Sequence, residues 1–296
     1  MKITFSDFIP LIIGMLLSLV LGTTIWNIFY FVFLFIGGSI TFGILLERYT
    51  KKKDFGRKVA ILMMMPIFIL FFGVMQRENM QIEETVVYGA YFFTTGIFTR
   101  VLIHYAIAKI VGPFIFGRGF CGWACWTAAV LEWLPIKENR CIPKKLTYIR
   151  VPVLIISIAI PFFIISAGYD YMGKHINDDG LNRLTQSAKW EQFLWFLVGN
   201  IIYYLVAIVL AFVFKKKRAF CKIACPVSLV MKLQSKVALT RKKPSGKKCI
   251  ECGKCNKVCP MDVDVMSDIK IGKKVSSTEC IGCNLCVKSC PVNAII

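Results

Sequence analysis

The sequence predicts a multi-pass α-helical membrane protein of about six transmembrane helices, with a C-terminal α+β domain like the two-cluster bacterial ferredoxins. Two observations support this fold class. The 296-residue chain is 56% hydrophobic, and its apolar residues fall in long uncharged runs, as in membrane proteins. Eight of its 13 cysteines lie near the C-terminal end, in two copies of one spacing. We therefore divide the chain into a transmembrane domain over 1–239 and a ferredoxin domain over 240–296.

Six apolar runs are candidates for membrane spans, since a span needs about 20 residues. They cover about 8–22, 26–46, 59–76, 86–111, 151–167 and 192–214. Lys and Arg cluster in loops after the second, fourth and sixth runs, and such basic loops stay in the cytoplasm. We expect a protein of the cytoplasmic (inner) cell membrane, with both termini and the ferredoxin domain on the cytoplasmic side. The loops 77–85 and 168–191 would face outward.

The net charge of +20 does not indicate nucleic-acid binding, because the basic residues lie mostly in short loops at the ends of apolar runs. Membrane lipid is the partner that such loops indicate. The C-terminal segment is basic as well, with 11 Lys or Arg against five Asp or Glu over 241–296. That charge suits either anionic lipid headgroups or the docking of an acidic soluble redox protein.

The C-terminal cysteines follow the C-x2-C-x2-C-x3-C-P run of two-cluster ferredoxins. In that motif the fourth cysteine of each run ligates the cluster held by the other run. We therefore expect two [4Fe–4S] clusters, one held by Cys249, Cys252, Cys255 and Cys290 and the other by Cys280, Cys283, Cys286 and Cys259. Zinc sites usually use C-x2-C pairs instead. Thiols used as metal ligands indicate a reducing compartment.

A second cysteine pattern is repeated within the transmembrane domain. RGFCGWACW begins at Arg118 and RAFCKIACP begins at Arg218, an offset of 218 − 118 = 100 residues. Each copy follows an apolar run that returns to the cytoplasm, and each precedes an amphipathic stretch, so the unit looks duplicated. We expect the four cysteines to converge on a third redox centre, because four thiolates are what one more iron–sulfur cluster needs. They are Cys121, Cys125, Cys221 and Cys225.

Three further expectations concern these loops. Pro226 suits the first turn of a helix and biases Cys225 away from helical geometry, whereas Trp126 takes the place of that proline in the first copy. A position at a helix N-terminus is expected to lower the pKa of the thiol. Cys141 stands alone, and we expect it to be a buried bystander.

The chain from about Tyr88 to its end resembles the membrane-bound polyferredoxins of the NapH/NosR type, which include the CcoG-like proteins. The resemblance rests on the tract GRGFCGWACW, a second C-x3-C-P after a later span, and the C-terminal double cysteine run. It implies an electron carrier. Some members are quinol dehydrogenases that feed respiratory reductases, and others serve oxidase assembly or nitrous oxide reduction. The extracytoplasmic flavin domain of NosR-type proteins has no counterpart in this sequence.

We expect a membrane-bound iron–sulfur protein that relays electrons between the quinone pool, or an extracytoplasmic redox partner, and a cytoplasmic carrier. The redox partner protein could be soluble or membrane-bound. The alternative is a copper reductase or assembly factor whose cysteine pairs bind or reduce the metal, since thiolates select Cu(I). The sequence leaves open whether the chain is itself an enzyme component of the quinol dehydrogenase type.

Arg100 and His104 are the candidate catalytic residues, as a quinone site. They lie four residues apart in the fourth apolar run and therefore share one helix face. Ionisable residues at membrane depth are functional candidates, and histidine exchanges a proton near neutral pH, which quinol oxidation requires. Two alternatives remain: Arg100 neutralises a cluster or pairs with an acidic residue such as Glu83 or Glu84, or His104 hydrogen-bonds a neighbouring helix.

Overall fold

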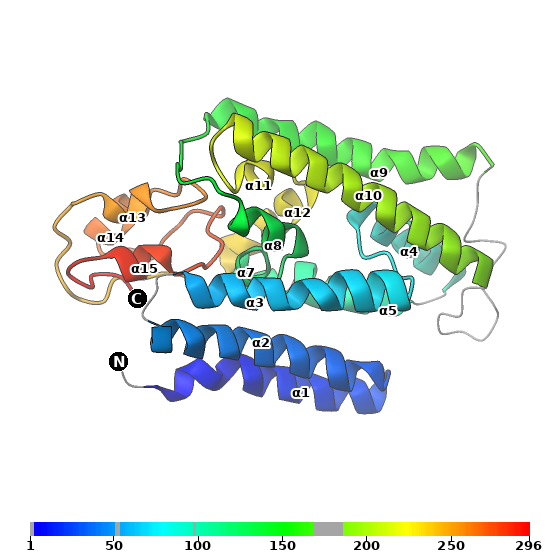
Figure 1. Ribbon diagram of the computed structural model, residues 1–296, viewed down its shortest axis with the longest axis horizontal. Coiled ribbons are helices and arrows are strands. Elements are labelled where there is room, and N and C mark those ends of the chain that lie inside the picture. The colour runs from blue at the N-terminus through cyan, green and yellow to red at the C-terminus, as the bar shows by residue number, and fades with distance from the viewer. Residues whose placement is uncertain (1–2, 51–53, 97–98, 169–185) are drawn as a thin grey trace.

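The computed structural model describes residues 3–50, 54–96, 99–168 and 186–296, and its regular structure over these residues is helical (Figure 1). Five helices in this described part of the chain are long and apolar enough to cross a membrane. They are η1 (Phe5–Phe8) with α1 (Ile9–Thr24), α2 (Ile28–Thr50), α3 (Phe55–Met65) with the π-helix η2 (Pro66–Met75), η4 (Lys144–Ile149) with α9 (Arg150–Ser166), and α10 (Gln186–Val213). Five of the six predicted apolar runs are thus confirmed as long helices.

The fourth predicted run, 86–111, is not one continuous helix. It is divided between α4 (Ile82–Thr95) and a second segment made of α5 (Arg100–Tyr105), the π-helix η3 (Ala106–Val111) and α6 (Gly112–Phe116). Gly96 ends α4 in the left-handed conformation, with φ of 74°, which an L-residue with a side chain rarely adopts. The apolar part of the second segment, Val101–Phe116, is shorter than the five long helices.

Close backbone contacts bring the first helices together. A Cβ added to Gly14 of α1 would lie 2.6 Å from the Phe33 carbonyl oxygen of α2. Small residues of this kind let apolar helices approach closely inside a membrane, where no hydrophobic force drives association. Deeper in the molecule, Trp126 donates to Asn200 Oδ1 of α10 at 3.2 Å, so a polar contact ties α10 to the centre of the bundle.

The C-terminal module, residues 240–296, contains three short helices: α13 (Lys254–Lys257), α14 (Val265–Lys270) and α15 (Leu285–Ser289). Within the described part of the chain no strand is formed, and the predicted α+β character is limited to an isolated antiparallel bridge between Pro244 and Ile295. Lys243 and Ile296 exchange two backbone hydrogen bonds of 2.9 Å beside that bridge. The first and last segments of the module are therefore joined.

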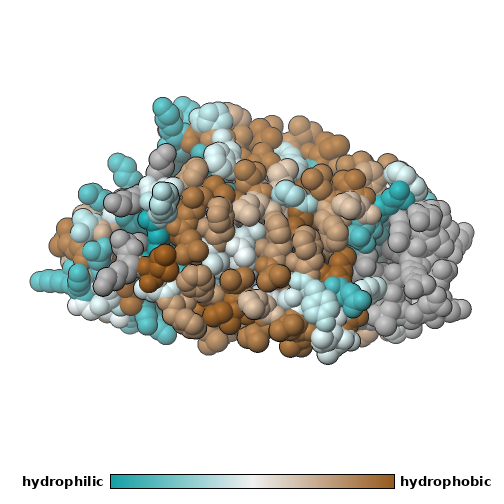
Figure 2. Space-filling model, turned by 60° about the horizontal axis from the view of Figure 1, so that its bottom comes forward, coloured by the Kyte–Doolittle hydropathy of each residue, from teal (hydrophilic) through white to brown (hydrophobic). Residues whose placement is uncertain are grey.

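Polar and apolar surfaces are separated along the molecule. Figure 2 shows apolar side chains over its middle and hydrophilic ones at the end occupied by the C-terminal module. In Figure 1 the N-terminus, the end of α2 and the end of α10 lie at that same end. The predicted outer loop 168–191 lies mostly outside the described residues, which resume at the first residue of α10.

Candidate functional site

The two cysteine loops have the same backbone geometry. The first contains α7 (Gly119–Trp123) and leads into α8 (Trp126–Trp133), and the second contains α11 (Ala219–Ile223) and leads into α12 (Pro226–Gln234). Cys125 and Cys225 are both extended N-cap residues, with φ and ψ of −72° and 119° and of −73° and 112°. Pro226 occupies the first helical position, as predicted, and Trp126 occupies the same position in the first copy.

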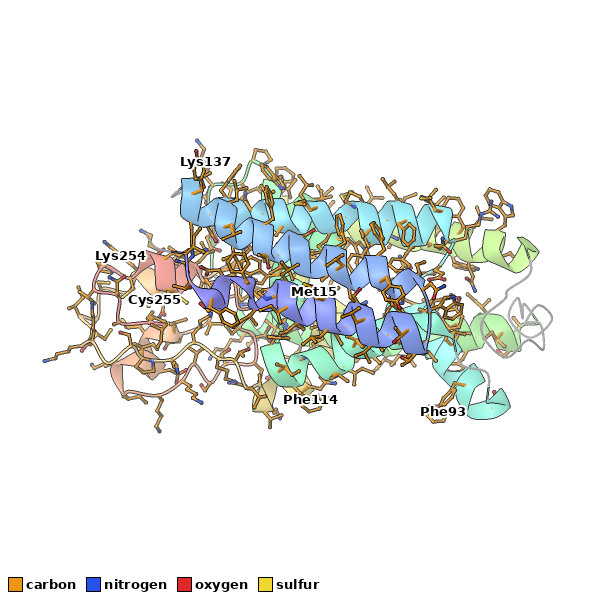
Figure 3. The ribbon with its side chains drawn as sticks, turned by 90° about the horizontal axis from the view of Figure 1, so that it is seen from below. Met15, Phe93, Phe114, Lys137, Lys254 and Cys255 are labelled. Atoms are coloured by element: carbon orange, nitrogen blue, oxygen red, sulfur yellow. The ribbon has the colours of Figure 1, made fainter. Side chains whose placement is uncertain are left out.

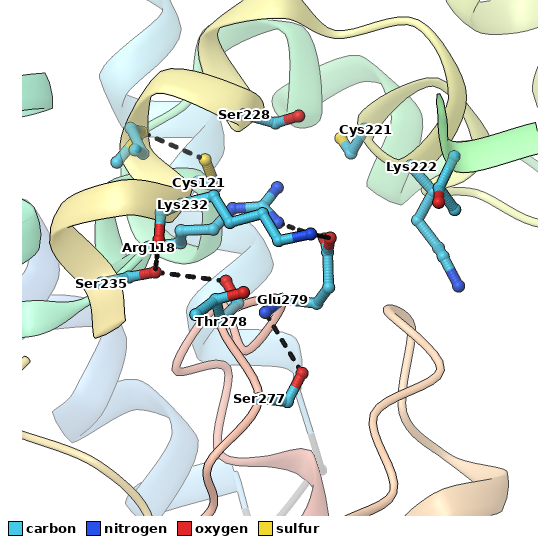
Figure 4. A network of polar contacts seen from close by, with 12 residues as sticks. Arg118, Cys121, Cys221, Lys222, Ser228, Lys232, Ser235, Ser277, Thr278 and Glu279 are labelled. Carbon is cyan, nitrogen blue, oxygen red and sulfur yellow. Dashed lines mark hydrogen bonds and ion pairs between the residues drawn. The ribbon is translucent and has the colours of Figure 1, made fainter. Parts of the chain in front are cut away.

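The two loops are joined by the arginine that opens the second. The Arg218 guanidinium donates to the Cys121 carbonyl at 2.8 Å and lies 4.0 Å from the Cys221 thiol. Both cysteines are buried, and the Cys121 thiol is 3.6 Å from the Met231 sulfur of α12. Figure 4 shows the Cys121 and Cys221 thiols on the same side of the Arg118 side chain. The structure thus brings the two loops together although 100 residues separate them.

The thiols of the four-cysteine site, defined here as Cys121, Cys125, Cys221 and Cys225, influence one another electrostatically. Burial, followed by the nearby Cys121 and Cys221, raises the pKa of Cys125 to about 11. Burial and the other three thiols also raise the pKa of Cys225. The expectation that a helix N-terminus lowers these pKa values is therefore wrong, because desolvation outweighs the helix dipole. A bound metal centre would have to stabilise the thiolates.

Arg118 supplies an independent sign that an acceptor belongs in this site. Its side chain is 0% exposed and pairs through Nη1 with Glu279 Oε2 at 2.5 Å. Its Nε and Nη2 atoms are buried and have no hydrogen-bond partner among the described residues. Burying donors without acceptors is costly, and these donors are next to thiols. Four thiols beside unpaired guanidinium donors fit an anionic iron–sulfur cluster, whose sulfur atoms accept hydrogen bonds.

A buried ion pair supports the second loop from the opposite side. Glu132 of α8 binds Arg218 at 2.6 Å and Arg57 of α3 at 3.1 Å, and all three side chains are nearly inaccessible. Burial alone would raise the pKa of Glu132, but Arg218 and Arg57 lower it to about 2. Arg57 also donates to the Gly122 carbonyl at 3.0 Å. Both cysteine loops are therefore held by guanidinium groups that share one carboxylate.

Lys109 lies beside the four-cysteine site. Its side chain is 3% exposed, donates to the Met80 carbonyl at 3.2 Å and lies over the Tyr105 and Trp126 rings at 4.3 and 5.0 Å. Trp126 directly follows Cys125, so a buried cation adjoins the first loop. A cation here would offset negative charge on the four thiolates.

Two cavities in the C-terminal module are each lined by four cysteines. The Cys252 cavity is lined by Cys249, Cys252, Cys255 and Cys290. The Cys283 cavity is lined by Cys259, Cys280, Cys283 and Cys286. This is the crossed grouping that the spacing predicts. Burial and the neighbouring thiols raise the pKa of Cys283 to about 11 and of Cys286 to about 12.

The two halves of the module are related by an offset of 31 residues, the difference between Cys280 and Cys249. Three pairs of positions with positive φ repeat at this offset: Glu251 and Gly282, Gly253 and Asn284, and Asp262 and Asn293. The sulfurs of the fourth cysteines also match, since Cys259 accepts from Val263 at 3.4 Å and Cys290 from Ala294 at 3.2 Å. The cysteine repeat therefore extends to backbone conformation and to hydrogen bonds to sulfur.

The Cys283 cavity is the one that adjoins the four-cysteine site. Trp123 Nε1 of the first loop donates to the Gly282 carbonyl at 3.1 Å. A Cβ on Gly122 would lie 2.1 Å from the Ile281 carbonyl oxygen, so only glycine permits this approach. Ile281 and Gly282 separate two cysteines that line the cavity. The ferredoxin-like module and the first cysteine loop are therefore in direct backbone contact.

Two carboxylates fix the module to the transmembrane domain. Glu279 binds Arg118 at 2.5 Å and Arg150 at 2.7 Å, as part of the network in Figure 4. Asp262 binds Lys216 and Lys222, both at 2.7 Å. Burial would raise the pKa of each carboxyl group, but these cations lower it below its usual range. Both anchors lie close in sequence to cysteines of the Cys283 cavity.

The remaining sequence candidates are His104, Arg100, Glu83 and Cys141. His104 is 4% exposed and packs against the rings of Phe29, Phe33 and Phe72 at 4.8, 6.2 and 4.7 Å. Arg100 begins α5, four positions earlier on the same helix, and its side chain lies outside the described residues. The Tyr203 hydroxyl donates to Glu83. Cys141 is exposed, which corrects the expectation of a buried residue, since it lies in an irregular loop.

Sequence reasoning identified the cysteines but not the charged residues around them. Arg118 and Arg218 occupy the same position in the two repeated tracts, and this match is the sequence signal that could have identified them. Lys109 and Glu132 carry no local signal, because their partners are distant in sequence. Among the described residues, no three His, Cys, Asp or Glu side chains are close enough to bind one shared metal ion. A [4Fe–4S] cluster does not need such a group, because each of its four ligands binds a different iron atom.

Comparisons with known proteins add an independent result. Residues 243–296 match a family described as a 4Fe-4S dicluster domain, and residues 102–136 and 198–246 match one described as a 4Fe-4S binding domain. The two segments of the second match contain both cysteine loops. Two uncharacterized proteins of Methanocaldococcus jannaschii are similar: MJ0749 is 25% identical over 64% of this chain and 73% of its own length, and MJ0750 is 28% identical over 55% and 67%. No solved structure matches.

These findings define the class of protein. The chain carries 4Fe-4S binding domains, and its described residues include five apolar helices that could span a membrane. It is a membrane iron–sulfur protein of electron transport. The names of these relatives state no activity, donor or acceptor.

Proposed function

We propose that this protein relays single electrons through three iron–sulfur sites, between the quinone pool or an extracytoplasmic redox partner and a carrier at the cytoplasmic face. Two sites are the cysteine sets of the Cys252 and Cys283 cavities, and the third is the four-cysteine site. A [4Fe–4S] cluster supplies reversible uptake of one electron. The chain's own contribution is to hold the thiols, bury them and surround them with cations.

The observation that carries the proposal is the contact between the first cysteine loop and the C-terminal module. Gly122 and Trp123, which lie between Cys121 and Cys125, pack against Ile281 and Gly282. The unpaired Nε and Nη2 donors of Arg118 support an anionic centre at the four thiols. Because electron transfer needs short separations between centres, a direct backbone contact between two cysteine sites favours a relay over two independent sites.

The finer assignments follow the resemblance to the NapH/NosR and CcoG-like polyferredoxins. The basic loops and the C-terminal module lie at one end of the molecule, which supports a topology with that end in the cytoplasm. A quinone site at Arg100 and His104 would make the protein a component of a quinol dehydrogenase. The aromatic rings around His104 provide the apolar setting in which a quinone ring binds.

The iron content of the full-length protein tests the proposal. Three four-iron clusters require about 12 iron atoms per chain, and the double substitution Cys121→Ser and Cys221→Ser should lower this to about eight. The matched control is Cys141→Ser, an exposed cysteine outside all three sites, which should leave iron unchanged. A wild-type protein with no more than eight iron atoms would refute the third site, and one dominated by zinc would refute the whole proposal.

One observation favours a second function, a copper reductase or assembly factor. The Cys121 thiol lies 3.6 Å from the Met231 thioether, and a thiolate with a thioether is a ligand pair that selects Cu(I). Copper retained after purification and lost in Met231→Leu would support this role. Iron retained in Met231→Leu, with no copper in the wild-type protein, would support the electron relay.

A further inference from the structure

The surface around the Cys252 cavity differs from the rest of the cysteine sites in being open. Of the eight cysteines that line the two cavities, Cys252 alone is exposed. Beside it, Ile250 is 57% exposed, although it is a large apolar residue that lines the same cavity. The Cys283 cavity, by contrast, is covered on the side of Gly282 by the first cysteine loop. One cavity therefore adjoins the transmembrane domain and the other presents a free surface.

The charge of this surface is positive and uncompensated. Lys247, Lys248 and Lys254 flank the first three cysteines of the run and are all exposed. None of these lysines forms an ion pair in the described part of the chain, whereas Glu251 is paired with Lys270 at 2.7 Å. An exposed apolar residue with unpaired cations before and after it in the chain forms a surface complementary to an acidic protein with an apolar centre.

The position of the surface argues against lipid as its occupant. Figure 3 shows Lys254 and Cys255 in the C-terminal module, beyond the ends of the long helices, and Figure 2 shows the apolar side chains over the middle of the molecule. Lys254 therefore lies beyond the apolar surface, on the side of the water, where a soluble protein is the available partner.

We propose that the surface formed by Lys247, Lys248, Ile250, Cys252 and Lys254 docks an acidic, soluble, one-electron carrier protein. This inference rests on the proposed function, because it names the partner at the aqueous end of the relay. In the exchange it serves, the carrier is reduced by one electron while the protein is oxidised by one, or the reverse, and no atom is transferred. The lysines orient the carrier, and Ile250 packs against its centre.

The test measures binding of an acidic flavodoxin to the full-length protein in nanodiscs of zwitterionic lipid. Wild-type protein should bind the flavodoxin, more weakly at 200 than at about 50 mM salt, and should not bind a basic cytochrome c. The variant K247Q/K248Q/K254Q should bind the flavodoxin roughly tenfold more weakly. The matched control K236Q/K273Q/K274Q removes three other exposed lysines, which lie outside the proposed docking surface, and should bind as the wild type does.

Three results would overturn the inference. The wild type could fail to bind the flavodoxin, or both triple variants could bind it equally weakly. In the third case K247Q/K248Q/K254Q would lose binding to anionic vesicles but bind the flavodoxin as the wild type does. The last would assign the lysines to lipid headgroups. Iron content and bleaching by dithionite are measured on the same samples. Protein that contains iron but does not bind the flavodoxin refutes this inference alone, whereas protein without iron refutes the proposed function.

Discussion

Arg218 donates a hydrogen bond of 2.8 Å to the carbonyl of Cys121, so the arginine that begins one cysteine loop holds the backbone of the other. The equivalent residue of the first loop, Arg118, instead forms an ion pair with Glu279 of the C-terminal module. Two equivalent arginines of a duplicated unit thus have different tasks. One joins the two loops of the four-cysteine site, and the other joins that site to the module.

Arg118 is expected to raise the reduction potential of the four-cysteine site. Arg118→Gln removes a buried positive charge beside the thiols and should lower the midpoint potential of that centre by about 60 mV, a tenfold change for one electron. Arg150→Gln is the control, because Arg150 binds the same Glu279 carboxylate as Arg118 but carries its positive charge at a different position. Potentiometric titration followed by electron paramagnetic resonance gives both values. Equal shifts in the two variants would show that Glu279 rather than Arg118 determines the potential.

Gly122→Ala should separate the module from the transmembrane domain. The new Cβ would lie 2.1 Å from the Ile281 carbonyl oxygen, and both groups are backbone, so neither can rotate away. We expect a loss of about 1–3 kcal/mol of stability, as in overpacked cores, and faster proteolysis near 240. Gly38→Ala in α2 is the control, because no atom lies within 4 Å of its added Cβ. Unchanged proteolysis of Gly122→Ala would contradict the contact.

Glu132→Gln should be strongly destabilising at all pH values near neutrality. Removing the carboxylate leaves Arg57 and Arg218 buried without their counter-charge, which costs about 3–5 kcal/mol. The folded pKa of about 2 lies below the usual value of 4.5, so the stabilisation is complete above pH 4.5 and is lost only as pH falls toward 2. The difference in melting temperature between variant and wild type should therefore be constant from pH 6 to 8.

The control for that experiment is Glu138→Gln. Glu138 pairs with Arg140 and Lys215 at the surface, where ion pairs contribute little, so its replacement should leave the melting temperature unchanged. The difference in melting temperature between the wild type and Glu132→Gln could instead shrink between pH 8 and 6. That result would mean that the Glu132 carboxyl group titrates near neutrality and is not held by the two arginines.

His104→Leu tests the quinone site. If His104 handles the proton of a bound quinol, the variant should lose reduction of its clusters by quinol and keep reduction by dithionite. Stopped-flow absorbance measures both rates on one sample. Phe72→Leu serves as the control, because it alters the same aromatic surroundings without removing a titratable group. Quinol reduction at the wild-type rate in His104→Leu would place the quinone elsewhere.

Local sequence signals predicted the long helices and the cysteine loops, because hydrophobic length, cysteine spacing and Pro226 act over a few residues. The break at Gly96 was missed, since an apolar run with one glycine looks continuous in composition. The pKa of Cys125 was predicted in the wrong direction, because burial depends on contacts with residues 100 positions away. For the same reason Arg57, Glu132 and Glu279 could not be assigned: each finds its partner across a long sequence separation.

The crossed cysteine sets restrict the order in which the protein can mature. Cys249, Cys252 and Cys255 share their cavity with Cys290, and Cys259 belongs to the cavity of the later run. Neither half of the module can complete a cavity by itself, and the four-cysteine site likewise needs both halves of the membrane domain. If the three sites hold iron–sulfur clusters as proposed, none of them can gain its four thiolates until the whole duplicated region has been synthesised and folded, and an interrupted chain would lack a finished centre.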